Sequence, residues 1–370
     1  MLIKHSAFRR LGMSRIERFR EKLRESKLDG FVLYNMESSN RSSSWYLSGF
    51  SGSFSVLIVT PKGEYIVTDS RYFTQAEIET HFKLIPFNNG DELKDVIQAT
   101  LAKDGASRVG FEEETISYGL YKRVFSQLGV ELEPVDSILK DLRMVKSPEE
   151  VEKMRLAVKI AEDALTETFN FIRPGRTEEE VCATLEYEIR KRGGYLAFET
   201  IVGSGPRSAI VHGRPSNRTL QEGDFLLIDY GARVDGYNSD ITRTYSIGEP
   251  SDEMVKVYEV VLKAQTEAKN ASKAGVIGSQ IHEVAASIIR EAGYGDYFGH
   301  GLGHSLGMDT HDGQGLSPKN CNPIPAGAVI TIEPGIYLPG KFGVRIEDDC
   351  YFCESGVEVL TNLDRELKIL

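Results

Sequence analysis

An internal duplication is the feature that most restricts how this 370-residue chain can fold. The segment 173–194 aligns without gaps on 273–294, and GDFLLIDYG (223–231) aligns on GAVITIEPG (327–335). Each half therefore reads as a helix, a glycine-marked turn, a second helix, a loop and a strand. Two related halves packed about a pseudo-twofold axis are the arrangement that this pattern predicts for residues 148–370.

Each half ends its strand with a carboxylate that is followed by a second one. Asp229 comes directly after the apolar run FLLI, and Glu333 comes directly after VITI. Asp240 lies 240 − 229 = 11 residues after the first acid, and Glu347 lies 347 − 333 = 14 residues after Glu333, each beyond a turn sequence. A hairpin at each turn would fold the second acid back beside the first. Most acids near turns are solvated, but a charge directly after a buried strand must be paired or bound to a cation.

Four of the chain's seven histidines accompany these acids. His300, His304 and His311 share the glycine-rich segment GHGLGHSLGMDTHDG (299–313), and His212 lies in VHGRP. Any one of them fits an ordinary loop or core role, but the four together favour a site. Glycine-rich loops also let the backbone approach a ligand closely.

The charge of this group of residues fits a pair of metal ions. Four carboxylates and one imidazole form a mainly oxygen site suited to manganese, cobalt or zinc. Two divalent cations would balance the four carboxylates, and a bridging hydroxide would leave a single negative charge. The whole chain has 44 Lys and Arg against 55 Asp and Glu, a net charge of −11, which argues against a protein that binds nucleic-acid backbones.

Five residues and their surroundings resemble the metal ligands of the pita-bread metallopeptidases. They are Asp229, Asp240, His304, Glu333 and Glu347, in the segments IDYGA, NSDITRT, GHSLG, TIEPGIY and VRIEDD. This family includes methionine aminopeptidase, aminopeptidase P and prolidase, and the resemblance covers essentially all of 148–370. It implies a pita-bread fold, two divalent metal ions with manganese ahead of cobalt and zinc, and commonly a homodimer.

The resemblance also implies a role for each ligand. Asp240 and Glu347 would bridge the two metals, Asp229 would complete one site, and His304 with Glu333 would complete the other. The metals would lower the pKa of a bridging water and polarise the scissile carbonyl. Glu333 would then carry a proton to the leaving proline nitrogen.

Further residues match family positions outside the ligand set. His212 and His311 match histidines that contact substrate and steady the tetrahedral intermediate. Arg345 matches an arginine that orients the bridging acids. Many relatives have Glu after the position of His311, whereas this chain has Asp312. Two other residues are expected to lie next to the ligands: His300 and Tyr337.

The part of the chain before the duplication predicts a small α/β domain. Strands are expected at 31–35, 54–60 and 64–70, and helices at 91–105 and 115–129. Ser147 and Pro148, followed by two glutamates, are typical of a helix start. We therefore expect domains at residues 1–143 and 144–370, an α/β (α+β) organisation in which the second domain is the pseudo-twofold catalytic one.

The first domain refines the expected activity. The segments YLSGFSGSFSVLIVT (46–60) and VTDSRYFTQA (67–76) are similar to the amino-terminal domain of aminopeptidase P, which methionine aminopeptidases lack. The resemblance implies a peptidase that acts on proline-containing peptides at the Xaa-Pro bond. Aminopeptidase P is preferred, prolidase is the alternative, and a metal-free binding module of the same fold is a distant one.

The remaining features indicate a reducing cytoplasm. Four cysteines are too few for a disulfide framework, and the pair Cys350 and Cys353 has no second pair to complete a zinc site. No apolar run is long enough to cross a bilayer, so no membrane association is expected. The first twelve residues are basic without an apolar core, unlike a secretory signal, and are interpreted as a frayed extension or a start assigned too early.

Overall fold

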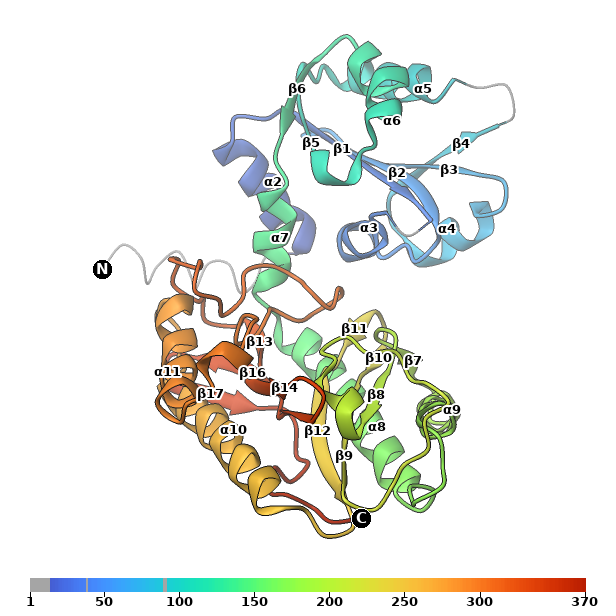
Figure 1. Cartoon of the computed structure of the whole chain (residues 1–370). Helices are drawn as coiled ribbons and strands as arrows, with labels where there is room; N and C mark the ends of the chain where they lie inside the picture. The colour runs from blue at the N-terminus through green and yellow to red at the C-terminus, as the bar shows by residue number, and fades with distance from the viewer. Residues whose placement is uncertain (1–13, 38, 89–91) are drawn as a thin grey trace. The chain divides into compact units, whose positions relative to one another are not determined.

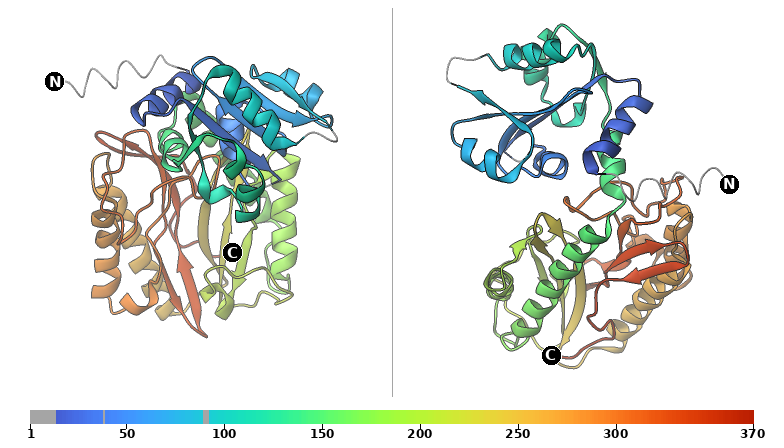
Figure 2. Two further views of the ribbon diagram at one scale, coloured as in Figure 1. Left: turned by 90° about the horizontal axis from the view of Figure 1, so that it is seen from above. Right: turned by 180° about the vertical axis from the view of Figure 1, so that it is seen from behind.

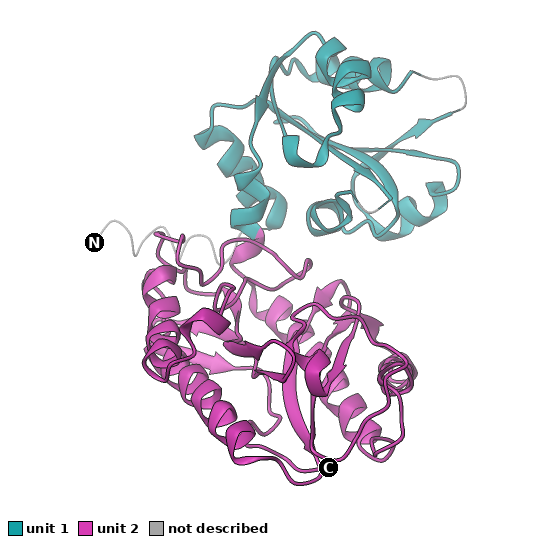
Figure 3. Ribbon diagram, viewed as in Figure 1, with its two compact units in different colours: residues 1–142 teal, residues 143–370 magenta. Residues whose placement is uncertain are grey.

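The computed structural model describes residues 14–37, 39–88 and 92–370 (Figure 1). The chain divides into two compact units, residues 1–142 and 143–370 (Figure 3). Both units combine helices with strands, which confirms the expected α/β class. No helix in these ranges is both long enough and apolar enough to span a membrane. The interpretation of the first twelve residues concerns positions outside the described ranges.

Unit 1, as far as it is described, is built on one six-stranded mixed sheet with the order β4-β3-β2-β1-β5-β6. Strand β2 is antiparallel to both β1 and β3, and the pairs β3–β4, β1–β5 and β5–β6 are parallel. Apolar rings hold helices to the sheet, since Phe19 of α2 packs edge-on against Phe31 of β1 at 5.0 Å. The elements are α2 (Arg15–Glu25), β1 (Gly30–Met36), α3 (Arg41–Ser48), β2 (Phe54–Val59), β3 (Glu64–Asp69), α4 (Phe73–Glu79), β4 (Lys83–Phe87), α5 (Leu93–Asp104), β5 (Arg108–Phe111), α6 (Tyr118–Arg123) and β6 (Glu131–Pro134). Helix α7 (Ser137–Met144) begins in unit 1 and ends in unit 2.

The strands expected at 31–35, 54–60 and 64–70 are confirmed as β1, β2 and β3, and α5 confirms the helix expected at 91–105. The single helix predicted for 115–129 is wrong, and its physical cause is local. The Ser117 hydroxyl accepts a hydrogen bond from the Leu120 amide at 3.2 Å, so a new helix starts there. Helix α6 then ends at Arg123, because the next residue, Val124, has φ −122° and ψ −69°.

Unit 2 contains two halves with the same order of elements, as the duplication predicts. Two helices flank each side of the unit, α8 and α9 on one and α10 and α11 on the other, with strands between them (Figures 1 and 2). The first half comprises α8 (Pro148–Thr168), α9 (Glu178–Lys191), β7 (Tyr195–Leu196), β8 (Ile201–Ser204), β9 (Asp224–Tyr230), β10 (Ala232–Val234), β11 (Tyr237–Asn238) and β12 (Ile241–Ile247). The second comprises α10 (Asp252–Ala271), α11 (Gly278–Glu291), β13 (Val329–Ile332), β14 (Gly335–Leu338), β15 (Phe342–Arg345), β16 (Asp348–Cys353) and β17 (Gly356–Val359).

The backbone repeats in detail between the halves. Gly175 has φ +87° and its counterpart Gly275 has φ +84°, so both chain turns use the left-handed region that favours glycine. The Gly175 amide donates to Leu220 O at 3.0 Å, and the Gly275 amide donates to Ile324 O at 2.8 Å. In each half the start of the second helix is therefore tied to the chain that returns to the central strand.

Both predicted hairpins are present and carry the acids to one place. Strand β9 pairs with β12 so that Asp229 lies opposite Thr242, and β13 pairs with β16 so that Ile332 lies opposite Asp348. The halves meet at these returning strands, where the Glu347 amide donates to Thr242 O at 3.1 Å. The pseudo-twofold relation thus brings the end of one hairpin against the end of the other.

A shared apolar core supports the second half around this meeting point. Val257 and Val261 of α10 and Ile281 of α11 are buried against Ile330 and Ile332 of β13. Burial of each such side chain stabilises the fold by about 1.5–3 kcal/mol relative to exposure. The carboxylates at the strand ends are consequently mounted on a rigid base.

Candidate metal centre

Four acids occupy the ends of the paired strands. Asp229 is the penultimate residue of β9, and Glu333 directly follows β13. Asp240 directly precedes β12, and Glu347 directly precedes β16. Asp229, Asp240 and Glu347 are 9%, 4% and 1% exposed, and the Glu333 side chain is 16% exposed. The hairpins therefore withdraw all four carboxylates from bulk water.

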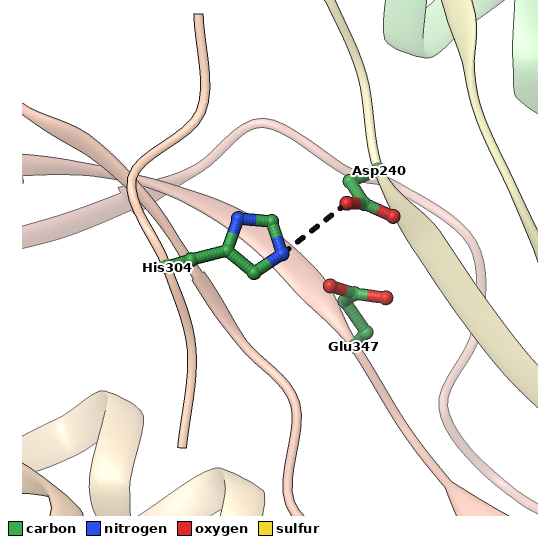
Figure 4. A group of neighbouring side chains, drawn as sticks. All are labelled: Asp240, His304 and Glu347. Atoms are coloured by element: carbon green, nitrogen blue, oxygen red, sulfur yellow. Dashed lines mark ion pairs between the residues drawn. The ribbon is translucent and has the colours of Figure 1, made fainter. Parts of the chain in front are cut away.

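His304 reaches this group from the glycine-rich loop. The His304 carbonyl accepts the Thr331 amide at 2.9 Å, so the loop lies along β13. A Cβ on Gly303 would stand 1.8 Å from Thr331 O, which means that only glycine permits this approach. The imidazole points at Asp240 and Glu347 (Figure 4). Ligand atoms of these three side chains all lie within 4.8 Å of one another.

His304 Nε2 lies close to one acid from each half. It lies 3.5 Å from Asp240 Oδ2 in the first half and 3.6 Å from Glu333 Oε1 in the second. Burial, together with the neighbouring His311, lowers the pKa of His304 to about 4. The ring is therefore neutral near pH 7, which is the protonation state that binds a metal.

The acids strongly disfavour their own ionisation when no cation is present. Burial, and next the nearby Glu347, raise the pKa of Asp240 well above its ordinary value. Burial, followed by the charge of Glu333, does the same to the pKa of Glu347. Burial raises the pKa of Glu333 to about 8, although Arg345 opposes the shift. A bound cation would reverse this preference by supplying the missing positive charge.

Two oxygens of the four acids are buried without any hydrogen-bond partner in the described residues, Asp229 Oδ1 and Glu347 Oε1, and Oδ1 of the neighbouring Asp349 is a third such carboxylate oxygen. Buried acceptors are ordinarily paired, so such atoms require an explanation. Oxygen-rich donors of this kind, with one neutral imidazole, suit divalent metal ions. The residues present therefore fit a divalent metal centre.

Arg345 connects the acids from outside the group. Its Nη2 donates to Asp229 Oδ2 at 2.5 Å, and its Nε donates to the Thr242 hydroxyl at 3.0 Å. Thr242 in turn donates to Glu347 Oε2 at 2.7 Å. Arg345 thus contacts one acid of the first half directly and reaches one of the second half through a threonine.

A hydrogen-bonded chain extends from Arg345 to another predicted residue. Arg345 Nη1 donates to the Tyr337 hydroxyl at 2.9 Å, and His300 Nε2 lies 3.0 Å from the same oxygen. Burial lowers the pKa of His300 to about 4, so this ring is neutral near pH 7. His300 is therefore connected to Asp229 through Tyr337 and Arg345.

The other two histidines border the group and are exposed. The ring centroid of His311 lies 4.2 Å from that of His304. Although the side chain is exposed at one side, partial burial of the ring, and then the nearby His212, lower the pKa of His311. Asp312 is 3% exposed and points away from solvent, with Oδ1 paired to Arg143 at 2.7 Å and Oδ2 accepting the Met308 amide at 3.0 Å. The acid after His311 thus anchors its loop.

Sequence reasoning missed two residues at the centre. Thr242 and Asp349 each stand two positions after a returning acid, so the duplication itself makes them equivalents. Asp349 is fully buried, and its Oδ2 accepts the Asp240 amide at 3.1 Å. The aligned acids Asp240 and Glu347, counted two residues forward, carried the signal. The cysteine pair at 350 and 353 lies on β16 as free thiols and takes no part in the site.

Two family descriptions match this chain. Residues 152–353 match metallopeptidase family M24, and residues 15–145 match the creatinase/prolidase N-terminal domain. The first match contains all the acids and histidines described above. The second covers most of unit 1.

Named relatives resemble the chain along nearly its whole length. An Xaa-Pro dipeptidase of Pyrococcus furiosus is 38% identical over 316 residues, which are 82% of this chain and 89% of the relative. The crystal structure of an X-Pro aminopeptidase from Thermotoga maritima superposes with a TM-score of 0.91 at 43% identity, covering 97% of this chain and 100% of the other. An Xaa-Pro dipeptidase from Bacillus anthracis gives a TM-score of 0.91 at 36% identity, covering 96% and 99%.

Proposed function

The chain belongs to metallopeptidase family M24, and from this membership we propose that it is an Xaa-Pro peptidase that releases the first residue of peptides with proline in second place. The observation that carries the proposal is the buried group of four acids and one neutral histidine, with the unpartnered oxygens Asp229 Oδ1 and Glu347 Oε1. A purely structural cluster would pair these oxygens with donors. A group that holds divalent cations leaves them available.

Two divalent ions would be held by Asp229, Asp240, His304, Glu333 and Glu347. By the family resemblance Asp240 and Glu347 would be shared between the ions, and in this structure the strands that carry them meet between the halves. Asp229 would serve one ion, and His304 with Glu333 would serve the other. When bound, the ions would activate a water molecule and polarise the scissile carbonyl.

The remaining residues would orient substrate and move a proton. Glu333 is the least buried of the four acids and would pass the proton to the leaving proline nitrogen. His212 and His311 are exposed, with His311 next to His304 and His212 close to His311, and they would contact the substrate and its developing negative charge. Arg345 would fix the direction of the acids through its bonds to Asp229 and Thr242.

The chemistry of the bond supports a metal-based route. An Xaa-Pro amide is tertiary, has no N–H and restricts the following φ. A peptidase that holds its substrate by strand-like hydrogen bonds loses that donor. Carbonyl activation requires no donor from the proline nitrogen, which needs only a proton as it leaves.

Xaa-Pro dipeptidase activity is the second candidate, and relatives named for it favour it. Both activities would use the same site residues. The segments GFSGS (49–53) and TDSRY (68–72) of unit 1 favour the aminopeptidase. A rate series over Xaa-Pro, Xaa-Pro-Xaa and longer peptides separates the two, because cleavage of the dipeptide alone would reverse the order.

Manganese is proposed as the native metal, with cobalt or zinc as alternatives, because the donors are mostly carboxylate oxygens. A homodimer and a cytoplasmic location are proposed with it. Four free cysteines accord with a reducing compartment. Sedimentation of the metal-loaded protein would test the dimer.

Metal analysis is the decisive experiment for the function. The protein loaded with manganese should retain two ions per chain after desalting and hydrolyse Xaa-Pro-Xaa tripeptides. Asp240→Asn should lose both properties, whereas Asp163→Asn, which changes a half-exposed acid on α8, should lose neither. Absence of bound metal in the unmodified protein, or undiminished hydrolysis by Asp240→Asn, would refute the metallopeptidase proposal.

A further inference from the structure

The loop between β8 and β9 carries His212, and its ends are held by one buried acid. Glu178, the first residue of α9, is 0% exposed. Its Oε1 accepts the amide and the hydroxyl of Ser204, both at 2.8 Å. Its Oε2 accepts the Ser216 amide at 3.0 Å and the Ser216 hydroxyl at 2.7 Å. A single carboxylate therefore joins residues 216 − 204 = 12 positions apart, one on each side of His212.

The same carboxylate also reaches into the loop. Arg207 Nε donates to Glu178 Oε2 at 2.9 Å. The other end of that guanidinium donates to the carbonyl of Arg214, two residues after His212. Glu178 accordingly fixes the two ends of the loop directly and its interior through an arginine.

His212 depends on this support because its own ring contributes none. The side chain is exposed, and among the described residues its imidazole has no hydrogen-bond partner. Two contacts hold the far side of the loop to β15 of the second half: Ser208 Oγ accepts the Gly343 amide at 2.8 Å, and Val211 O accepts Arg345 Nη1 at 3.4 Å. The position of the ring is thus set by the main chain of the loop.

The second half shows that the fold does not require an acid at this position. The duplication aligns Glu178 with Gly278, the first residue of α11. Both amides make the same bond to the returning chain, Glu178 to Arg218 O at 3.1 Å and Gly278 to Asn322 O at 3.3 Å. In the second half Asn320 fills the space instead, since a Cβ on Gly278 would lie 2.4 Å from Asn320 Nδ2. Glu178 is therefore particular to the loop that carries His212.

We propose that Glu178 is a positioning residue that holds the 204–216 loop so that His212 faces the metal centre. The inference rests on the proposed function, because it assigns His212 a part in Xaa-Pro hydrolysis. In the described structure Glu178 itself has no hydrogen bond to the four acids or the histidine of the centre. Its effect on the reaction passes through the loop.

A double-mutant cycle with an activity-independent readout tests this. Glu178→Ala and His212→Ala should each lower kcat/KM on an Xaa-Pro-Xaa tripeptide, by roughly 10- to 100-fold, as expected for a misplaced or missing group. The double variant should fall no more than about twofold further, since non-additivity marks residues that act as one unit. Manganese content should stay at the level of the unmodified protein in all three.

Hydrogen exchange decides the loop's part independently of the reaction. Amides of residues 204–216 should exchange about tenfold faster or more in Glu178→Ala, while those of the opposite loop, 315–322, keep their rates. Asp104→Asn changes a buried acid of unit 1 and serves as the control for lost stability, with both readouts unchanged. If Glu178→Ala does not fold, Glu178→Gln, which keeps one acceptor oxygen, should give smaller changes in the same direction.

Three results would overturn the proposal. They are unchanged exchange in 204–216, losses that multiply in the double variant, and full activity in His212→Ala. A protein that binds metal and shows the predicted exchange change but hydrolyses no Xaa-Pro peptide would instead refute the proposed function. The two failures are therefore distinguishable.

Discussion

The two halves of unit 2 share a backbone but divide the work of the site unequally. The first half supplies two aspartates, and the second supplies two glutamates and His304. The turns, the helix starts and the paired strands repeat closely, as the φ values of Gly175 and Gly275 illustrate. The loops that return to the central strands differ, because one is held by Glu178 and the other closes over Gly278.

The duplication therefore keeps the turns and strands the same in both halves, whereas the returning loops are free to differ. The turns, helix starts and paired strands that both halves share, here called the frame, bring the strand ends together at the pseudo-twofold axis. The frame therefore fixes the positions of the acids. The loops that return to the central strands are not part of the frame. Any side chain that makes hydrogen bonds to their backbone can hold them in place. Metal binding, to which both halves contribute acids, should therefore depend on the frame. Substrate contact should depend on the loops.

The largest expected effect tests the symmetric part. Asp240→Asn and Glu347→Gln remove equivalent acids from the two halves, and each should lower kcat/KM by about a thousandfold or more. Metal ions supply several kcal/mol of transition-state stabilisation, and each 1.36 kcal/mol is tenfold in rate. Steady-state kinetics with metal analysis measures both losses. A loss confined to one of the two variants would break the equivalence of the halves.

A smaller effect should distinguish the two residues that follow these acids. The Thr242 hydroxyl accepts a hydrogen bond from Arg345 and donates one to Glu347. Thr242→Val removes both and should reduce metal affinity by roughly 10- to 100-fold. Thr242→Ser keeps the hydroxyl and should restore most of it. Metal titration monitored by activity provides the measurement.

The equivalent position in the second half should respond differently. Burial raises the pKa of Asp349 well above its ordinary value, and the residue serves mainly as acceptor for the Asp240 amide. Asparagine keeps an acceptor oxygen, so Asp349→Asn should change metal affinity by less than about threefold. A larger loss in Asp349→Asn than in Thr242→Val would mean that the asymmetry runs the other way.

The sequence predicted the strands, the turns and the meeting of the acids better than it predicted the side chains that hold the loops in place. Periodicity and turn glycines predicted β1 to β3, the hairpins and the convergence of the acids, because these depend on local pattern and on the duplication. The helix expected at 115–129 was wrong because Ser117 starts a new helix inside it. Glu178 bonds to Ser216, 216 − 178 = 38 residues away, and no local pattern reports such a contact. The roles assigned to the site residues stay predictions until variants are measured.

Metal removal should show how much the buried acids of the two halves destabilise the folded protein when they ionise. In the metal-free protein the pKa of Glu333 is raised by burial to about 8, against an ordinary value of 4.5. The folded state therefore holds its proton more tightly than the unfolded state, so this stabilisation is present below pH 4.5 and is lost as pH rises to about 8. The melting temperature of chelated protein should fall by roughly 5 °C or more between pH 5.5 and 8, and saturating manganese should abolish the decrease. A rise over that range in chelated protein would contradict the buried-acid account.

The smallest effect addresses the frame alone. Gly175 and Gly275 have nearly equal positive φ, and a Cβ on either would meet nothing within 4 Å. Alanine at each position therefore costs only backbone strain, about 1 kcal/mol, or roughly 2–4 °C in melting temperature. The two losses should agree within error when measured by calorimetry. Gly278 does not have a positive φ, but Gly278→Ala should cost more because its Cβ would lie 2.4 Å from Asn320 Nδ2 and 2.9 Å from Gly315 O. Unequal losses at Gly175 and Gly275 would show that the halves differ in the frame as well as in the loops, because neither site offers a side-chain contact that could account for the inequality.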